Sequence, residues 1–352
     1  MSRRTLSLAS GGEHVALLAP DVSVIIVNWN GSRLLGRCLS ALRIQTHPSY
    51  QVVLVDNGSS DDSLTLVERD YPEVVVIRND TNLGFAAANN IALNRIQSRY
   101  VATLNNDTQV EPTWLAELAR GMEKNPTIGM CASKMLFLED QKTINSAGIS
   151  VDRAGIAWDR RGGEPDDDRP EQPEEIFGPC AGAALYRRKM LEEISFFDED
   201  FFAYMEDVDL AWRAQLAGWR CLYVPTARVY HAHSATAGEG SPVKNRLKGR
   251  NTLWTIAKNY PWPDWLCYLP AILFYDLAAV AYTLVVQRDV NPLRGRLEAL
   301  RGLRSLMLKR RAVQALRVIP SRVMLSRLEP IESPLRVLRR YRHLSDMGVG
   351  RD

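Results

Sequence analysis

The chain has 352 residues, of which 46% are hydrophobic and 24% charged, and this composition excludes a disordered or fibrous protein. Its length suffices for one large domain or two smaller ones with a sizeable core. The net charge of +3 hides an asymmetry, because residues 287–352 hold 16 lysines and arginines against 6 aspartates and glutamates. We therefore expect a neutral or acidic body and a basic C-terminal region suited to an anionic surface.

The cysteines are odd in number and widely spaced, without a CxxC pair. This pattern excludes a zinc site and a disulfide framework, and it predicts reduced, mostly buried thiols in a cytosolic protein. The five are Cys38, Cys131, Cys180, Cys221 and Cys267. Residues 1–20 lack an apolar run of signal-peptide length, so we expect a flexible tail there.

From residue 21 onward, short β-branched runs alternate with helical patterns. The expected strands are Val22–Val27, Gln51–Asp56, Glu73–Arg78 and Tyr100–Asp107. The expected helices are Leu34–Ile44, a helix capped by Ser60 and Asp61 that ends at Pro72, and Gly84–Ile96. Near-continuous apolar strands alternating with helices predict an α/β fold whose parallel sheet is covered on both faces.

Each of these four strands ends in asparagine or aspartate. The strand-end segments are Asn28–Gly31, Asp56–Ser60, Asn79–Asn82 and Asn105–Asp107. Turn chemistry alone favours these residue types at any single strand end. Four such ends at one edge of a sheet predict a polar, acidic crevice at the place where this architecture binds ligands.

The segment after the first strand, NWNGSRLLG, contains neither GxGxxG nor GxxxxGK[ST]. Phosphate groups bound in the crevice would therefore need another positive partner, and a divalent metal held by carboxylate would serve.

Two acidic segments follow in the second half of the body. Arg160–Glu175 is rich in charge and proline, and we expect a solvent-exposed, mobile loop whose acids are solvated rather than bound to metal. The segment FFAYMEDVDLAWRAQLAGW places Glu206, Asp207 and Asp209 within four residues. Taken alone, they fit a helix start, with Asp209 and Arg213 as an i,i+4 pair.

The C-terminal region is basic and partly apolar. Leu269–Val286 is an 18-residue apolar stretch interrupted by Asp276. A membrane span needs about 20 residues, and a lipid-facing aspartate costs a few kcal/mol. We prefer a helix that lies in the membrane interface or packs on the body, although spanning stays open. Leu293–Val318 repeats leucine and arginine, as a basic amphipathic surface helix or a helical cap on the body does.

Seven segments in order resemble glycosyltransferase family 2, which has the Rossmann-like GT-A fold, and especially its bacterial rhamnosyltransferase-like branch. They are VSVIIVNWNG, VLVDNGSSDDS, NLGFAAANN, LNND, GPCAGAALYRR, FDEDFFAYMEDVDLAWRAQLAGW and YHAH. The likeness covers about Val22–Asn259 and implies an inverting, metal-dependent enzyme that uses a nucleotide-diphosphate sugar. We expect a tail over 1–20, a GT-A domain over 21–259 and a helical, membrane-associating region over 260–352.

The resemblance also implies donor-binding and metal-binding residues. Asp56 would contact the nucleobase, with Val27 and Asn28 lining the same pocket, while Asn82, Gly84 and Phe85 would border the nucleotide and sugar. The other donor-binding candidates are Asn30, Asn57, Ser59, Asn105 and Asn106.

Asn105-Asn106-Asp107 stands where the family has its DxD motif, with Asn as a departure at the first position. Asp107 therefore carries the metal assignment and Asn105 assists. His231, or less favourably His233, would complete a site for Mn²⁺ or Mg²⁺, which accept oxygen ligands with an imidazole.

Asp207 would be the general base, with Glu206 orienting it or the acceptor. Inverting transfer is a single displacement at the anomeric carbon. It needs one carboxylate for the proton of the acceptor hydroxyl and a metal to offset charge on the leaving diphosphate.

Other protein classes fit less well. A sugar-nucleotide pyrophosphorylase would carry a glycine-rich basic loop after the first strand, and a processive membrane synthase would need several spans and usually QxxRW. A non-catalytic glycan-binding or membrane scaffold protein with the GT-A fold stays open, but it would not need Asp107 and Asp207 together.

The expected partners follow from the resemblance. The donor would be a dTDP- or UDP-sugar, with rhamnose favoured, and the acceptor a glycan or lipid-linked glycan in cell-surface polysaccharide synthesis. We expect a cytoplasmic protein peripherally attached to the cytoplasmic face of the membrane, without a nucleic-acid partner. Neither the linkage formed nor the oligomeric state follows from the sequence.

Overall fold

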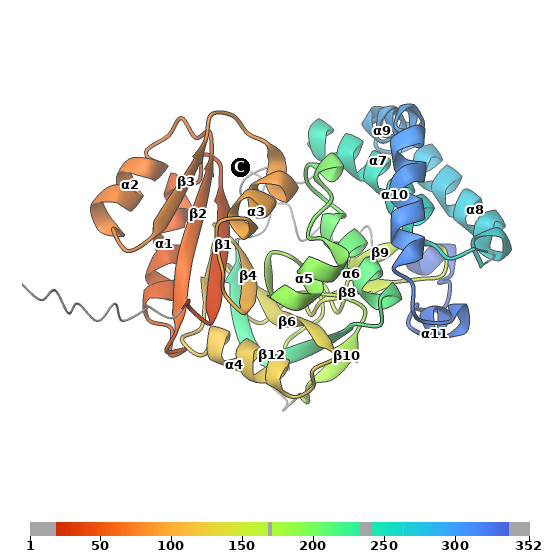
Figure 1. The fold of residues 1–352 in the computed structure, drawn as a ribbon. Helices are drawn as coiled ribbons and strands as arrows, with labels where there is room; N and C mark the ends of the chain where they lie inside the picture. The colour runs from red at the N-terminus through yellow and green to blue at the C-terminus, as the bar shows by residue number, and fades with distance from the viewer. Residues whose placement is uncertain (1–18, 168–170, 233–240, 263, 338–352) are drawn as a thin grey trace, which may run out of the picture.

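Figure 1 shows the computed structural model, which describes residues 19–167, 171–232, 241–262 and 264–337. A β-sheet with helices on both faces forms the body, and the helices from residue 242 onward lie at one end of it. The strands are β1 (Val22–Asn28), β2 (Tyr50–Asn57), β3 (Val75–Asn79), β4 (Tyr100–Asn105), β5 (Thr108–Val110), β6 (Ile128–Phe137), β7 (Ile144–Ser146), β8 (Ile149–Val151), β9 (Ala157–Asp159), β10 (Glu174–Ile176), β11 (Ala183–Arg187) and β12 (Arg220–His231). The helices are α1 (Ser32–Arg43), α2 (Ser63–Asp70), α3 (Gly84–Leu93), α4 (Trp114–Glu123), α5 (Arg188–Ile194), the 3₁₀ turn η1 (Glu199–Phe201), α6 (Glu206–Leu216), α7 (Pro242–Asn259), α8 (Asp264–Val285), α9 (Asn291–Arg301), α10 (Leu303–Ala315) and α11 (Ser321–Ser326).

The main sheet has the strand order β10-β12-β6-β11-β4-β1-β2-β3, with β5 beside β12 and β7 beside β6. Strands β4, β1, β2 and β3 are parallel neighbours, as predicted. The other half of the sheet is mixed, because β11 runs antiparallel between β4 and β6. No helix occurs between β6 and β11 in the described residues, and antiparallel pairing needs no crossover helix.

Both faces of the sheet are covered, as the continuous apolar strands predicted. Val24 and Ile26 of β1 share one core with residues of α1, α2 and α4. Ile25 points to the opposite face and shares a second core with residues of α3, α5 and α6. Between the two helical layers, the carboxyl ends of the strands carry polar residues that include Asn28, Asp56 and Asn106.

Predicted element ends differ from the observed ones by a few residues. Helix α2 begins at Ser63 with Asp62 at the N-cap, so Ser60 and Asp61 are not its caps. Asp61 instead accepts hydrogen bonds from the backbone N–H groups of Ser32 at 2.9 Å and Ser63 at 3.1 Å, which ties α1 to α2. Strand β4 ends at Asn105, because the next two residues turn into β5.

The prediction of solvated acids in the loop at 160–175 is wrong for Asp166 and Glu171. Asp166 Oδ1 lies 2.9 Å from Lys134 Nζ and Asp166 Oδ2 lies 3.0 Å from Arg228 Nη2. Glu171 Oε1 lies 2.6 Å from the same Lys134 nitrogen. The Lys134 side chain on β6 is only 4% exposed, and a buried ammonium requires paired acids. This loop therefore neutralises a charge within the body.

The cysteines of the described residues are unpaired, as predicted. Cys38, Cys131 and Cys221 are buried, Cys180 is half-buried and Cys267 is exposed.

The C-terminal helices pack on the body through α7, which contacts α6, α9 and α10. Helix α8 contains the apolar stretch and Pro270, and it is the one helix of the described residues that is long and apolar enough to cross a membrane. Ile272 is its single buried residue, and Asp276 pairs with Arg296 of α9 at 2.6 Å. The basic segment after it is two helices, α9 and α10, which meet at Gly302. The domain boundaries stay predictions.

Candidate active site

A hydrogen-bonded cluster of polar side chains lies at the carboxyl ends of β1, β2 and β4. Asn28 and Asp56 are opposite each other in the β1–β2 register, and Asn28 Nδ2 donates to Asp56 Oδ1 over 3.3 Å. Asn106 Nδ2 donates to Asn28 Oδ1 over 2.8 Å. Ser59 Oγ accepts from Asn28 Nδ2 at 3.2 Å and from the backbone N–H of Asn30 at 2.9 Å. The fold thus brings five predicted donor-binding residues into one network, beside the half-buried Val27.

A second group holds the loop that leads into α3. Asn57 Nδ2 donates to Asn82 Oδ1 and to the carbonyl oxygen of Gly84, both at 3.1 Å. Gly84 has φ of +87°, and a Cβ there would lie 2.6 Å from the backbone oxygen of Phe202, so only glycine fits. Phe85 is half-buried and packs against Phe197, with ring centroids 5.6 Å apart. The contacts of Asn57, Asn82, Gly84 and Phe85 with a nucleotide or sugar stay predictions.

Asp107 and His231 face each other at the same sheet edge. Thr108 of β5 is opposite His231 of β12 in the register, which places Asp107 beside that histidine. His231 Nε2 lies 3.2 Å from Asp107 Oδ1 and 3.4 Å from Asn105 Nδ2. Both predicted ligands are buried. The alternative ligand, His233, lies outside the described residues.

This donor set fits a divalent cation. His231 Nδ1 lies 2.9 Å from the amide oxygen of Asn145, which can only accept, so Nδ1 carries the proton. In the neutral imidazole, Nε2 then directs a lone pair at a carboxylate oxygen, and a shared cation would stabilise these two electron-pair donors. The described residues contain no group of three or more His, Cys, Asp or Glu side chains that could hold a metal ion, and this site offers two. Two protein ligands leave most of the coordination shell of Mg²⁺ or Mn²⁺ to water and substrate oxygens.

Asp207 reaches the same sheet edge from the first turn of α6. Its Oδ2 accepts from the backbone N–H of Ala181 at 3.3 Å, and its Oδ1 accepts from that of Val208 at 2.8 Å. The next residue, Gly182, accepts from the backbone N–H of Asn105 at 2.9 Å. Two consecutive residues therefore join the predicted general base to the strand end that carries the predicted metal ligand.

Burial raises the pKa of both acids at the start of α6, Glu206 and Asp207. It raises the pKa of Glu206 well above its usual range, and the nearby charge of Asp207 raises it further. Burial also raises the pKa of Asp207, to about 6, partly opposed by hydrogen bonds from Ala181 and Val208. Glu206 is therefore the harder of the two acids to ionise, and Asp207 is the one suited to accept a proton near neutral pH. Glu206 Oε2 is buried without a hydrogen-bond partner in the described residues.

Comparison with known proteins decides the family. The family sequence model described as "Glycosyl transferase family 2" matches residues 23–195. The N-acetylglucosaminyl-diphospho-decaprenol L-rhamnosyltransferase of Mycobacterium tuberculosis is 30% identical over 235 residues, which cover 60% of this chain and 76% of that protein. The chain belongs to glycosyltransferase family 2. The match agrees with the rhamnosyltransferase-like branch that the motifs predicted, and the protein is a glycosyltransferase.

Another relative of this glycosyltransferase is the pre-mycofactocin glycosyltransferase of Mycobacterium tuberculosis, 29% identical over 220 residues that cover 60% of this chain and 43% of that protein. Solved structures confirm the GT-A fold. GalNAc-T7 with UDP, GalNAc and Mn²⁺ aligns with a TM-score of 0.57 at 17% identity, covering 81% of this chain and 55% of that one. Residues 1–349 of Staphylococcus aureus TarS align with a TM-score of 0.55 at 17% identity, covering 93% and 89%.

Sequence reasoning missed the residue that supports the loop before Asp207. Asn251 of α7 is fully buried, and its side-chain amide donates to the carbonyl oxygens of Phe201, Ala203 and Tyr204 at 3.0, 2.9 and 2.7 Å. The same loop contains three residues with positive φ: Phe202, Tyr204 and Met205. The one sequence signal is an asparagine inside a helix, where this residue type is unfavourable.

Two further residues of this glycosyltransferase escaped sequence reasoning. Asn145 orients His231, as described above. Asp159, at the end of β9, is close enough to Asp207 to raise its pKa by charge repulsion. Both reach the site from short strands between β6 and β11, and their sequence surroundings carry no recognisable motif.

Proposed function

We propose that this glycosyltransferase transfers a sugar from a nucleotide-diphosphate donor to a hydroxyl of a lipid-linked glycan, with inversion and with dependence on Mn²⁺ or Mg²⁺. Rhamnose from a dTDP donor is the favoured sugar. The observation that carries the proposal is the position of Asp207, an ionised base joined through Ala181 and Gly182 to the strand end that bears Asp107. The M. tuberculosis relative, an N-acetylglucosaminyl-diphospho-decaprenol L-rhamnosyltransferase, supports rhamnose and an N-acetylglucosaminyl-diphospho-lipid acceptor.

In this mechanism one bond forms as another breaks. Asp207 accepts the proton of the acceptor hydroxyl while that oxygen bonds to the anomeric carbon. The bond from the anomeric carbon to the diphosphate breaks, and the nucleoside diphosphate leaves with the electron pair. Glu206, which keeps its proton more readily than the neighbouring Asp207, donates a hydrogen bond to the acceptor and fixes its orientation.

Asp107 and His231 would hold the divalent cation, with Asn105 assisting. When bound, the cation would offset the charge that develops on the leaving diphosphate. Complexes of the fold neighbours GalNAc-T7 and the mannosyltransferase of Pyrobaculum calidifontis contain Mn²⁺, which supports this assignment.

The proposed location is the cytoplasmic face of the cell membrane, with peripheral contact through residues 260–352. Helix α8 supports this location because it exposes apolar side chains to water, and contact with a membrane would cover them. They include Leu266, Leu273, Phe274 and Leu277. Changing Leu273 and Leu277 to Gln should reduce flotation with vesicles, whereas Ile44→Gln with Val75→Gln, equally exposed on the body, should not. Equal flotation of all variants would contradict this location.

A transfer assay tests the proposed activity. The purified protein is incubated with dTDP-rhamnose, UDP- or GDP-sugars and a short-chain N-acetylglucosaminyl-diphospho-prenol, with Mn²⁺ or with EDTA. We expect rhamnosylated lipid with the dTDP donor, and loss of the product in EDTA. Absence of transfer from every donor would refute the acceptor class, and transfer in EDTA would refute the metal requirement.

A further inference from the structure

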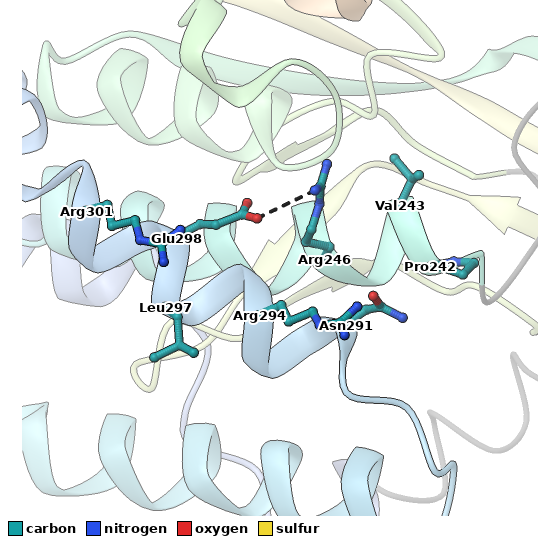
Figure 2. Close-up of a pocket in the computed structure, with 8 residues that line it drawn as sticks. All are labelled: Pro242, Val243, Arg246, Asn291, Arg294, Leu297, Glu298 and Arg301. Atoms are coloured by element: carbon teal, nitrogen blue, oxygen red, sulfur yellow. Dashed lines mark ion pairs between the residues drawn. The ribbon is translucent and has the colours of Figure 1, made fainter.

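A groove of about 390 Å³ lies between α7 and α9, outside the candidate active site. Figure 2 shows its lining, which comes from the first turns of α7 and from one side of α9. The lining residues are Pro242, Val243, Arg246, Asn291, Arg294, Leu297, Glu298 and Arg301. Nothing in the proposed mechanism uses these side chains.

The groove is basic. Arg246, Arg294 and Arg301 are exposed, whereas Glu298 is the one acid of the lining. Glu298 Oε1 lies 3.5 Å from Arg246 Nη1, the ion pair drawn in Figure 2. Asp289, the acid before α9, is hydrogen-bonded to Asn245 and Asn291. The charge of Arg294 helps to lower the pKa of Asp289, but neither Arg294 nor Arg301 forms a close ion pair within the described residues, so both guanidinium groups can meet an anion.

Direct backbone contact between α7 and α9 fixes the shape of the groove. A Cβ on Gly249 would lie 2.4 Å from the carbonyl oxygen of Pro292, and a Cβ on Gly295 would lie 2.0 Å from that of Arg246. The backbones of α7 and α9 therefore touch at these two glycines, and a larger residue at either position would force the helices apart. The arginines are therefore presented by a rigid frame, which lowers the entropic cost of binding.

The groove lies between the candidate active site and the apolar helix. Lys244, on the same turn of α7 as Val243, has its ammonium 5.6 Å from the ring centroid of Tyr204, three residues before Asp207. On the other side, Arg296 of α9 pairs with Asp276 of α8. These contacts connect the helix that bears Val243 with the loop before Asp207, and the helix that bears Leu297 with α8.

We propose that this groove binds the diphosphate of the lipid-linked acceptor, an inference that rests on the proposed function. Arginine forks form paired, charge-assisted hydrogen bonds with phosphate oxygens. The sugar at one end of the diphosphate extends toward Asp207. The prenyl chain at the other end contacts Leu297 and continues along the exposed apolar side of α8.

The test is acceptor kinetics in detergent with the full chain. Arg294→Gln with Arg301→Gln should raise the KM for a short-chain N-acetylglucosaminyl-diphospho-prenol at least ~10-fold, because two charge-assisted contacts are lost. The KM for the donor, and that for an alkyl N-acetylglucosaminide without phosphate, should stay unchanged. Lysine at both positions should restore part of the affinity.

Arg304→Gln with Arg311→Gln is the matched control, since it removes the same charge from exposed positions on α10 outside the groove. Equal KM changes in the two double variants, or equal changes for both acceptors, would overturn the inference. So would a groove variant that loses binding to phosphatidylglycerol vesicles but keeps its KM in detergent, because the arginines would then bind membrane headgroups. If the unmodified protein transfers no sugar to the diphosphate acceptor, the proposed function itself fails.

Discussion

The side-chain amide of Asn251 lies 2.7 Å from the backbone oxygen of Tyr204, and it also bonds the carbonyl oxygens of Phe201 and Ala203. This buried contact determines how the chain enters α6, since Tyr204 and Met205 have φ of 68° and 69°. Non-glycine residues in this conformation persist only where the surroundings compensate the strain. A residue of α7 therefore positions Asp207, although the two are 44 positions apart in the sequence.

We predict that Asn251→Ala lowers kcat by ~10-fold or more while leaving the KM for the donor nearly unchanged. Three buried carbonyl groups lose their donor, which costs about 1–3 kcal/mol for each unsatisfied group unless the loop moves. If the loop moves, Asp207 leaves the position from which it is proposed to act on the acceptor. Steady-state kinetics and a melting curve measure the two effects.

Asn259→Ala is the control, because Asn259 is an equally buried asparagine two turns later on α7 and contacts Asp209 instead. We expect it to lower the melting temperature but to keep most of kcat. Equal losses of kcat in both variants would show that Asn251 acts through general stability.

The pH dependence of transfer follows from Asp207. Burial raises its pKa from the ordinary 3.8 to about 6, and a general base must be ionised to work. The rate should therefore be constant above about pH 7 and fall tenfold per unit well below pH 6. A profile of kcat/KM against pH measures this, with nucleotide binding followed in parallel. An acid limb near pH 4 would contradict the buried environment of Asp207.

Metal binding should depend on His231 but not on His47, whose side chain contacts Asp21 just before β1. We predict that dTDP with Mn²⁺ raises the melting temperature, and that His231→Ala or Asp107→Asn removes the increment due to Mn²⁺. A ligand at 100 times its Kd adds about 2.7 kcal/mol to the free energy of unfolding. His47→Ala, which alters the contact with Asp21, should leave the increment intact. A Mn²⁺-dependent increase in melting temperature that persists in His231→Ala would disprove the metal assignment.

The buried pair of Lys134 and Asp166 should be necessary for stability. Replacing Asp166 with Asn leaves the Lys134 ammonium short of a counter-charge in a buried site, and such losses cost about 3–5 kcal/mol. Denaturant unfolding would measure this loss in the free energy of unfolding. Arg69→Gln, which breaks an exposed pair with Asp70, should leave the midpoint unchanged. A small effect of Asp166→Asn would mean that Glu171 alone provides enough counter-charge for Lys134.

Local patterns were enough to predict much of this architecture. The apolar strands predicted β1 to β4, and their parallel order gathered Asn28, Asp56 and Asn106 at one edge. The i,i+4 pair of Asp209 and Arg213 was also predictable, and it forms at 2.8 Å. Spacing along one element determines such contacts, so the sequence contains them directly.

Contacts between distant elements were not predictable in this way. Asn145 reaches His231 across 86 positions, and Asn251 reaches Tyr204 across 47. Asp209 also contacts Lys258 at 2.8 Å, so its role extends beyond the helix pair that the sequence indicated. A polar residue in a loop or helix has many possible partners, and only the packing of the sheet and of α7 selects one.

The most direct test of the account is the configuration and rate of transfer by Asp207→Asn and Glu206→Gln, beside the unmodified protein. NMR of the glycolipid should show an anomeric configuration opposite to that of the donor. Asp207→Asn should bind dTDP normally but transfer at least ~10²-fold more slowly, the scale of a general base. Glu206→Gln, which resembles the neutral acid, should keep most of the rate. Retained configuration, or Asp207→Asn at full rate, would contradict the central claim that Asp207 is the base of an inverting transferase.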